Sequence, residues 1–208
     1  MKTIKITTLL LSFLLSIQIF ACETCGCSSK KNTHNHSENS INKDIDISKS
    51  SVKWLGEKVT GSHEGTVSIK EGHLHFDNNI FTGGNVVIDM STIECTDLVG
   101  EPKSSIEGHL SSDDFFGIKK YPTANLEIVN AEKIKYSKNK YKVSAILEIK
   151  SIKNNIELEV VIDNGSAIVD LVIDRTLYNI KYGSGSFIDN LGDKTIYDDF
   201  KLSVSLKY

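Results

Sequence analysis

A period-two alternation of apolar and polar residues is the feature that most constrains the fold of this chain. Between residues 140 and 150 the charged or small polar residues share one parity, interrupted only by Ile146. The opposite parity is apolar throughout: Tyr141, Val143, Ala145, Leu147 and Ile149. This pattern predicts a β-strand with one buried face and one solvated face, because successive side chains of a strand point to opposite sides.

Several other segments repeat the alternation. Their apolar positions are Ile156, Leu158, Val160 and Ile162; Ala167, Val169, Leu171 and Ile173; and Phe200, Leu202, Val204 and Leu206. Asn164-Gly165 predicts a hairpin turn between the first two, since both residues tolerate positive φ. Further turns are expected at Glu71-Gly72 and Gly83-Gly84. At least seven sequential antiparallel strands favour an up-and-down barrel or a sandwich.

One segment, residues 104–116, has helical rather than strand spacing. Ile106, His109, Leu110 and Asp113 recur at that spacing, and Ser104 or Ser105 is a suitable N-cap. Gly108 favours two short turns over one long helix. Tyr121-Pro122 marks the end of this non-strand segment, because the residue before a proline avoids the helical region of backbone conformation.

The N-terminus predicts export from the cell. Lys2 and Lys5 precede the apolar run Leu9–Phe20, which is too short to span a bilayer comfortably. Ala21-Cys22 ends a stretch that resembles a bacterial lipobox, so we expect a signal peptide over 1–21 and lipidation of Cys22. The alternative is ordinary secretion with Cys22 as a plain thiol. Lipidation would attach the protein to the periplasmic face of the cell envelope or to the outer membrane.

Residues 22–48 are rich in Ser, Asn, Lys and His and predict a flexible polar tether before a single domain over 49–208. If Cys22 carries lipid, Cys25, Cys27 and Cys95 remain, and an odd number leaves at least one thiol without an intramolecular disulfide. The tail cysteines with His34 and His36 leave a minor metal-binding function open. No dedicated metal site is expected, since zinc ligands must converge on one ion.

Charge and residue patterns also narrow the function. The formal net charge of −3 argues against nucleic-acid binding, because proteins that bind nucleic acid usually carry an excess of positive charge. We find no catalytic constellation and expect no enzyme and no cofactor other than a bound lipid. His63, His73 and His75 are interpreted as outward histidines on a solvated face in preference to a metal set.

Three motifs in order resemble the YceI-like family over Ser50–Tyr208. The central motif runs from Gly108 through Phe116 to Lys119–Ala124, with the form HL-x-x-x-x-FF followed by YP-T. Trp54-Leu55-Gly56 with Gly61–Gly65 is similar to the opening strand and first turn of the family. Ile173–Thr176 with Tyr182-Gly183 is similar to its late arginine motif, from which Leu177–Asn179 departs.

The resemblance implies an all-β, extended, lipocalin-like antiparallel barrel of about eight strands. Its long apolar tunnel would hold a polyisoprenoid, quinone or similar amphiphile without catalysis. A structural or stress-related envelope protein with a filled barrel is the alternative, and a homodimer stays open. The candidate lipid-binding residues are Trp54, His109, Phe115, Phe116, Tyr141, Val143, Ala145, Leu147, Leu158, Val160 and Arg175.

Some of these candidates have a second interpretation. Arg175 is the only arginine of the chain, and its planar fork suits either a buried ion pair with Asp174 or Asp113 or a lipid head group. His109 is interpreted first as a hydrogen-bonded core residue. Trp54, Phe115 and Phe116 either line the tunnel, plug one end of the barrel or simply pack the core.

Overall fold

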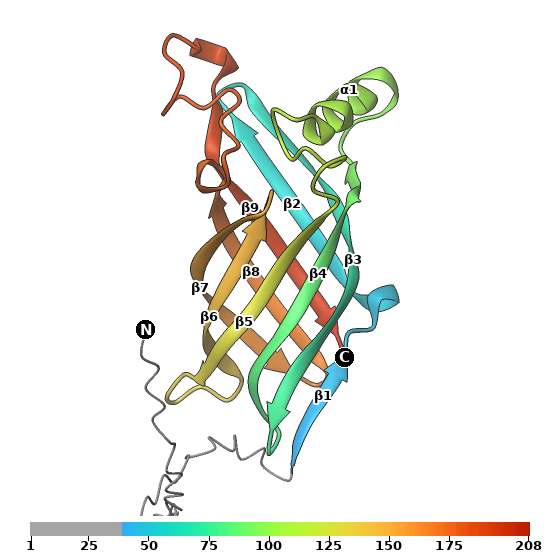
Figure 1. Cartoon of the computed structure of the whole chain (residues 1–208), viewed down its shortest axis with the longest axis vertical. Coiled ribbons are helices and arrows are strands. Elements are labelled where there is room, and N and C mark those ends of the chain that lie inside the picture. The colour runs from blue at the N-terminus through green and yellow to red at the C-terminus, as the bar shows by residue number, and fades with distance from the viewer. Residues whose placement is uncertain (1–38) are drawn as a thin grey trace, which may run out of the picture. The chain divides into compact units, whose positions relative to one another are not determined.

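The computed structural model describes residues 39–208 and shows a closed antiparallel barrel (Figure 1). The strands are β1 (Ser40–Asp44), β2 (Ser51–Lys58), β3 (Gly61–Asp77), β4 (Ile80–Cys95), β5 (Thr123–Lys133), β6 (Lys140–Ile149), β7 (Ile152–Asp163), β8 (Ser166–Asp174) and β9 (Ile196–Lys207). The helices are α1 (Gly100–Ser111) and the 3₁₀ turns η1 (Ile47–Lys49), η2 (Arg175–Tyr178) and η3 (Gly192–Lys194). No helix among residues 39–208 has the length and apolar character of a membrane span.

The barrel closes through eight strands, β2 to β9. Neighbours along the sheet run β2-β9-β8-β7-β6-β5-β4, and the pairing of β3 with both β4 and β2 completes the ring. All pairings between these strands are antiparallel. The predicted all-β barrel of about eight strands with a short helical insertion is therefore confirmed.

The ninth strand, β1, corrects the predicted start of the domain. β1 pairs with the end of β3, from Ser40 opposite Asp77 to Asp44 opposite His73. Ile45, which follows it, is buried in the core, and Asp46 caps η1 by accepting a hydrogen bond from the Ser48 backbone N–H. Residues 40–48 thus belong to the folded domain, because one apolar side chain and a row of strand hydrogen bonds fix them. The predicted signal peptide and the rest of the predicted tether lie outside the described residues.

Two expected turns are absent, because the glycines serve close packing instead. β3 runs through Glu71-Gly72 and turns only at Asn78-Asn79, where φ is 50° and 64°. β4 likewise runs through Gly83-Gly84. A Cβ at Gly84 would lie 2.5 Å from the His73 carbonyl oxygen, and one at Gly72 would lie 2.8 Å from Ile45 Cδ1. The turn predicted at Asn164-Gly165 is confirmed, with φ of 44° and 76°.

The helix begins and ends earlier than the spacing predicts. α1 is one continuous helix, and its N-cap Val99 makes no side-chain cap hydrogen bond, so neither Ser104 nor Ser105 caps it. Residues 112–120 continue as turns. α1 and the segment 175–195 lie at the same end of the barrel, called here the capped end (Figure 1). The β3–β4 and β7–β8 turns lie at the opposite end.

Candidate ligand-binding interior

The barrel interior holds two apolar cavities that meet. The cavity toward the capped end measures about 140 Å³, and its wall includes Trp54, Phe115 and Phe116. The second measures about 100 Å³, and its wall includes Phe81, Val160 and Ala167. Five residues line both: Val52, Ile88, Ala124, Leu147 and Leu202. The two cavities therefore follow one another along the interior, separated by this shared ring of side chains.

The predicted lipid-binding residues differ in which cavity, if either, they line. Trp54, Phe115, Phe116 and Arg175 line the first cavity, Leu158 and Val160 line the second, and Leu147 lines both. Tyr141, Val143 and Ala145 line neither cavity, although all three point inward and are buried. They pack into the core beside the second cavity: Tyr141 pairs with Val160 and Val143 with Leu158, both of which line that cavity. The ring centroids of Tyr141 and Phe81 are 5.6 Å apart.

His109, the remaining candidate, also lies away from both cavities. Its ring lies 4.2 Å from the ring of Tyr182 and 5.5 Å from that of Phe115, measured between centroids. Its buried Nε2 has no hydrogen-bond partner within residues 39–208, so the interpretation as a hydrogen-bonded core residue is wrong. Burial lowers the pKa of His109, against the opposing charge of Asp114, and so favours the neutral ring.

Arg175 holds the capped end together. Its side chain is only 2 % exposed. Nε donates to the Tyr197 carbonyl at 3.0 Å, Nη1 donates to Ile180 and Tyr182 at 2.9 Å each, and Nη2 donates to Ile196 at 3.1 Å. The ion pair is with Asp198, at 3.5 Å, so the predicted partners Asp174 and Asp113 are wrong. Sequence spacing could not identify Asp198, because the loop 179–195 folds back before β9 begins.

Lys150 fixes the segment around Asp113 and Phe115 by donating to backbone carbonyls, as Arg175 does for the loop before β9. It lies in the β6–β7 turn and donates from Nζ to the carbonyls of Asp113 and Phe115, at 3.1 and 2.7 Å. Burial lowers the pKa of Lys150, while Asp113 and Asp114 oppose the shift. This cation fixes the turns that place Phe115 and Phe116 over the first cavity. The role of Lys150 could not be predicted from the sequence, since a lysine in a turn has no pattern of its own.

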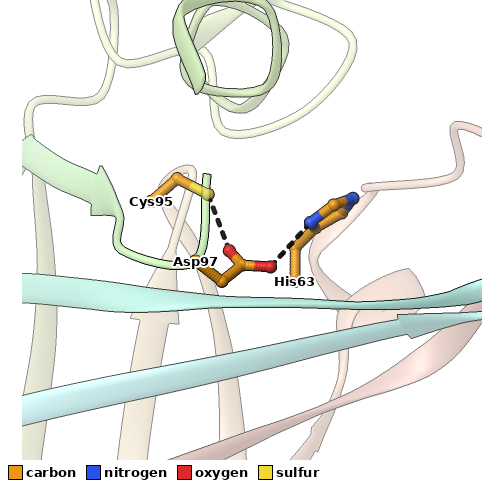
Figure 2. Close-up of side chains that lie close together, drawn as sticks. All are labelled: His63, Cys95 and Asp97. Carbon is orange, nitrogen blue, oxygen red and sulfur yellow. Dashed lines mark hydrogen bonds and ion pairs between the residues drawn. The ribbon is translucent and has the colours of Figure 1, made fainter. Parts of the chain in front are cut away.

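A polar cluster at the capped end was also missed. His63 Nδ1 lies 3.0 Å from Asp97 Oδ2, and Cys95 Sγ donates to Asp97 Oδ1, also at 3.0 Å (Figure 2). The hydrogen bond from Cys95 is the main reason that the pKa of Asp97 is held at about 2; burial opposes this shift, and the hydrogen bonds from His63 and from the Glu64 backbone N–H add to it. Burial raises the pKa of the Cys95 thiol. Cys95 is the free cysteine of the described residues.

The histidine pair of β3 lies on the outer face, as predicted. His73 and His75 are partly exposed, and their ring centroids are 4.7 Å apart. His75 Nδ1 hydrogen-bonds the side chain of Asn42 on β1. Burial, and then the neighbouring His73, lowers the pKa of His75. The pair therefore supports the contact between β1 and β3.

The fold and interior define a class: closed antiparallel barrels that enclose an apolar space under a capped end. Within that class, the model of the YceI-like domain matches residues 44–208. This chain belongs to the YceI-like family. No curated protein sequence matches it.

Solved structures of low sequence identity share the fold. BcnA of Burkholderia cenocepacia has a TM-score of 0.61 at 20% identity, covering 78% of this chain and 98% of that one. A polyisoprenoid binding domain from Saccharophagus degradans has a TM-score of 0.56 at 15% identity, covering 81% and 96%. The YceI protein of Campylobacter jejuni has a TM-score of 0.50 at 20% identity, covering 74% and 82%.

Proposed function

We propose that this protein binds a long apolar lipid, of the polyisoprenoid or quinone type, inside its barrel in the cell envelope, and carries it without chemical change. The observation that supports this most is the pair of apolar cavities that lie next to each other in the interior and share five lining residues. Membership in the YceI-like family, and a polyisoprenoid-binding domain with the same fold, support the ligand class.

The cavity volumes set a physical condition on binding. An apolar cavity of about 150 Å³ holds one benzene-sized molecule. The two spaces of about 140 and 100 Å³ each accept a group of that order, so a chain of tens of carbons requires the shared ring to open. Each CH₂ removed from water contributes about 0.8 kcal/mol, which is the driving force for displacing those side chains.

The same volumes favour a second candidate, a structural barrel filled by its own side chains. The two candidate functions predict different effects of a large side chain at Ala124. This small buried residue of β5 lines both cavities, so a large side chain there would occupy the space that a long chain needs to extend from one cavity into the other. In a filled barrel the same change would only overpack the core, at about 1–3 kcal/mol.

Lipid recovered from the full chain purified from its native host, identified by mass spectrometry, tests the proposal. Ala124→Phe should lose most of the co-purified lipid, and Ala131→Phe should keep it. Ala131 is the matched control, because it is a buried alanine of the same strand that lines neither cavity. Circular dichroism checks the fold of each variant, and Ala124→Leu replaces Ala124→Phe if the latter does not fold. Wild-type protein without lipid, or equal lipid in both variants, would favour the filled barrel.

A further inference from the structure

Three potential metal ligands converge where β3 and β4 meet α1. One nitrogen of His63, the sulfur of Cys95 and a carboxylate oxygen of Asp97 all lie within 4.8 Å of one another. Figure 2 shows Asp97 between the other two side chains, with both directed toward its carboxylate. These are the three ligand types that zinc binds in proteins, through sulfur, imidazole nitrogen and carboxylate oxygen.

The strand register produces this convergence and makes it rigid. Cys95, the last residue of β4, pairs with Gly65 of β3. The Thr96 backbone N–H donates to the Glu64 carbonyl at 2.9 Å, so the pairing continues and brings Asp97 opposite His63. The Glu64 backbone N–H also donates to Asp97 Oδ1 at 3.2 Å. The backbone thus holds the carboxylate in place before any ion arrives.

We propose that His63, Cys95 and Asp97 form a binding site for a divalent transition-metal ion of the zinc type, with a solvent molecule as fourth ligand. The thiol proton leaves to solvent when the ion binds, and His63 binds through Nδ1 with its single ring proton on Nε2. One thiolate and one carboxylate then neutralise the charge of the ion. A neutral site suits the position, since Cys95 is fully buried while the side chains of His63 and Asp97 are each 28 % exposed.

The surroundings support a ligand role for Cys95. Its backbone N–H donates to Glu107 Oε1 of α1 at 3.0 Å, so the helix fixes the position of the sulfur. Lys103 of α1 lies 2.6 Å from Glu94 and 3.7 Å from Glu107, and these carboxylates offset its charge near the site. The exposed sides of His63 and Asp97 leave a path from solvent.

Cobalt(II) titration of the purified full chain tests the site, because a thiolate bound to cobalt gives a sulfur-to-metal charge-transfer band. The predicted tail contains Cys22, Cys25 and Cys27, so the measurement uses the chain with Cys22→Ser, Cys25→Ser and Cys27→Ser. Cys95 is then the only thiol. We expect a saturable band with one cobalt ion per chain, which added zinc abolishes.

Variants in the same background assign the ligands. Cys95→Ser should remove the band, and His63→Ala and Asp97→Asn should each weaken cobalt binding at least ~10-fold, since even outer-shell partners contribute 10–100-fold. His75→Ala, on the same strand but outside the cluster, should bind as the parent does. A thermal melt of each variant without metal confirms folding. Absence of the band in the parent, or equal affinity in parent and cluster variants, would overturn the metal site and leave a purely structural hydrogen-bond cluster. Neither outcome depends on lipid binding.

Discussion

At the residue scale, the sole arginine of the chain organises the capped end. Arg175 donates to four backbone carbonyls: those of Ile180 and Tyr182 in the loop after η2, and those of Ile196 and Tyr197 at the start of β9. A lysine at this position would keep the charge but could not present donors in a planar fork. The arginine therefore has a geometric role in joining η2, the loop and β9, and its guanidinium also faces the Phe115 ring at 5.8 Å from the ring centroid.

Replacing this arginine should destabilise the protein strongly. Arg175→Ala leaves buried carbonyls without donors and Asp198 without its cation, so we expect a loss of about 3–5 kcal/mol in the free energy of unfolding. Arg175→Lys should recover only part of it. Urea unfolding followed by circular dichroism measures both. A loss below about 1 kcal/mol for Arg175→Ala would show that the loop does not depend on this side chain.

The half-buried His109 ring predicts a pH dependence of stability. Its pKa in the folded state lies below the ordinary value of 6.5, chiefly because of burial, so the unfolded chain binds more protons around that pH. Stability is therefore fully present above pH 6.5 and falls as the pH is lowered from 6.5 toward the folded-state pKa. His109→Phe should make this slope shallower in urea unfolding measured across that window. An unchanged slope would assign the dependence to other groups, among them His75, whose pKa is also lowered.

At the element scale, β1 is an edge strand that extends the barrel beyond its eight-stranded ring. Most of its residues are exposed, and the buried Ile45 after it supplies the apolar anchor. Lys43 adds cation–π contacts, with Nζ 4.8 Å from the Phe76 ring centroid and 5.0 Å from that of Tyr208. The start of the domain is therefore determined by the buried side chain of Ile45 and by the short run of strand pairing between β1 and β3.

Alanine substitutions of two isoleucines in this region should have different effects on the free energy of unfolding. Ile45→Ala removes a core side chain and should lower the free energy of unfolding by about 2–4 kcal/mol. Ile41→Ala, in β1 but 43 % exposed, should change it by less than about 0.5 kcal/mol. Urea unfolding curves of the two variants provide the comparison. If both variants unfolded at the midpoint of the unaltered protein, residues 40–48 would add nothing to the stability of the barrel.

At the scale of the whole molecule, we propose that a lipid anchor at Cys22 tethers the barrel to a membrane of the cell envelope. The apolar run Leu9–Phe20 followed by Ala21-Cys22 motivates this. One acyl chain anchors only marginally, so stable attachment requires more than one. Cys22→Ser should move the protein to the soluble fraction or leave the signal peptide uncut. Unchanged membrane fractionation together with an unchanged mass would contradict the anchor.

The sequence by itself determined the strand faces, the Asn164-Gly165 hairpin and the family. These are local properties, because a period of two assigns each side chain to a face and a positive-φ turn needs only its own residues. Spacing therefore placed Leu147, Leu158 and Val160 on the interior face, where they line the cavities.

Only the tertiary structure decided which inward residues line a cavity and which distant groups meet. Tyr141, Val143 and Ala145 share a face with Leu147 yet line neither cavity, since their side chains are packed into the core, where the Tyr141 ring contacts that of Phe81. Gly72 and Gly84 look like turn residues in sequence but sit where paired strands approach closely. The Arg175–Asp198 pair and the cluster of His63, Cys95 and Asp97 depend on loop closure and strand register, which no local pattern encodes.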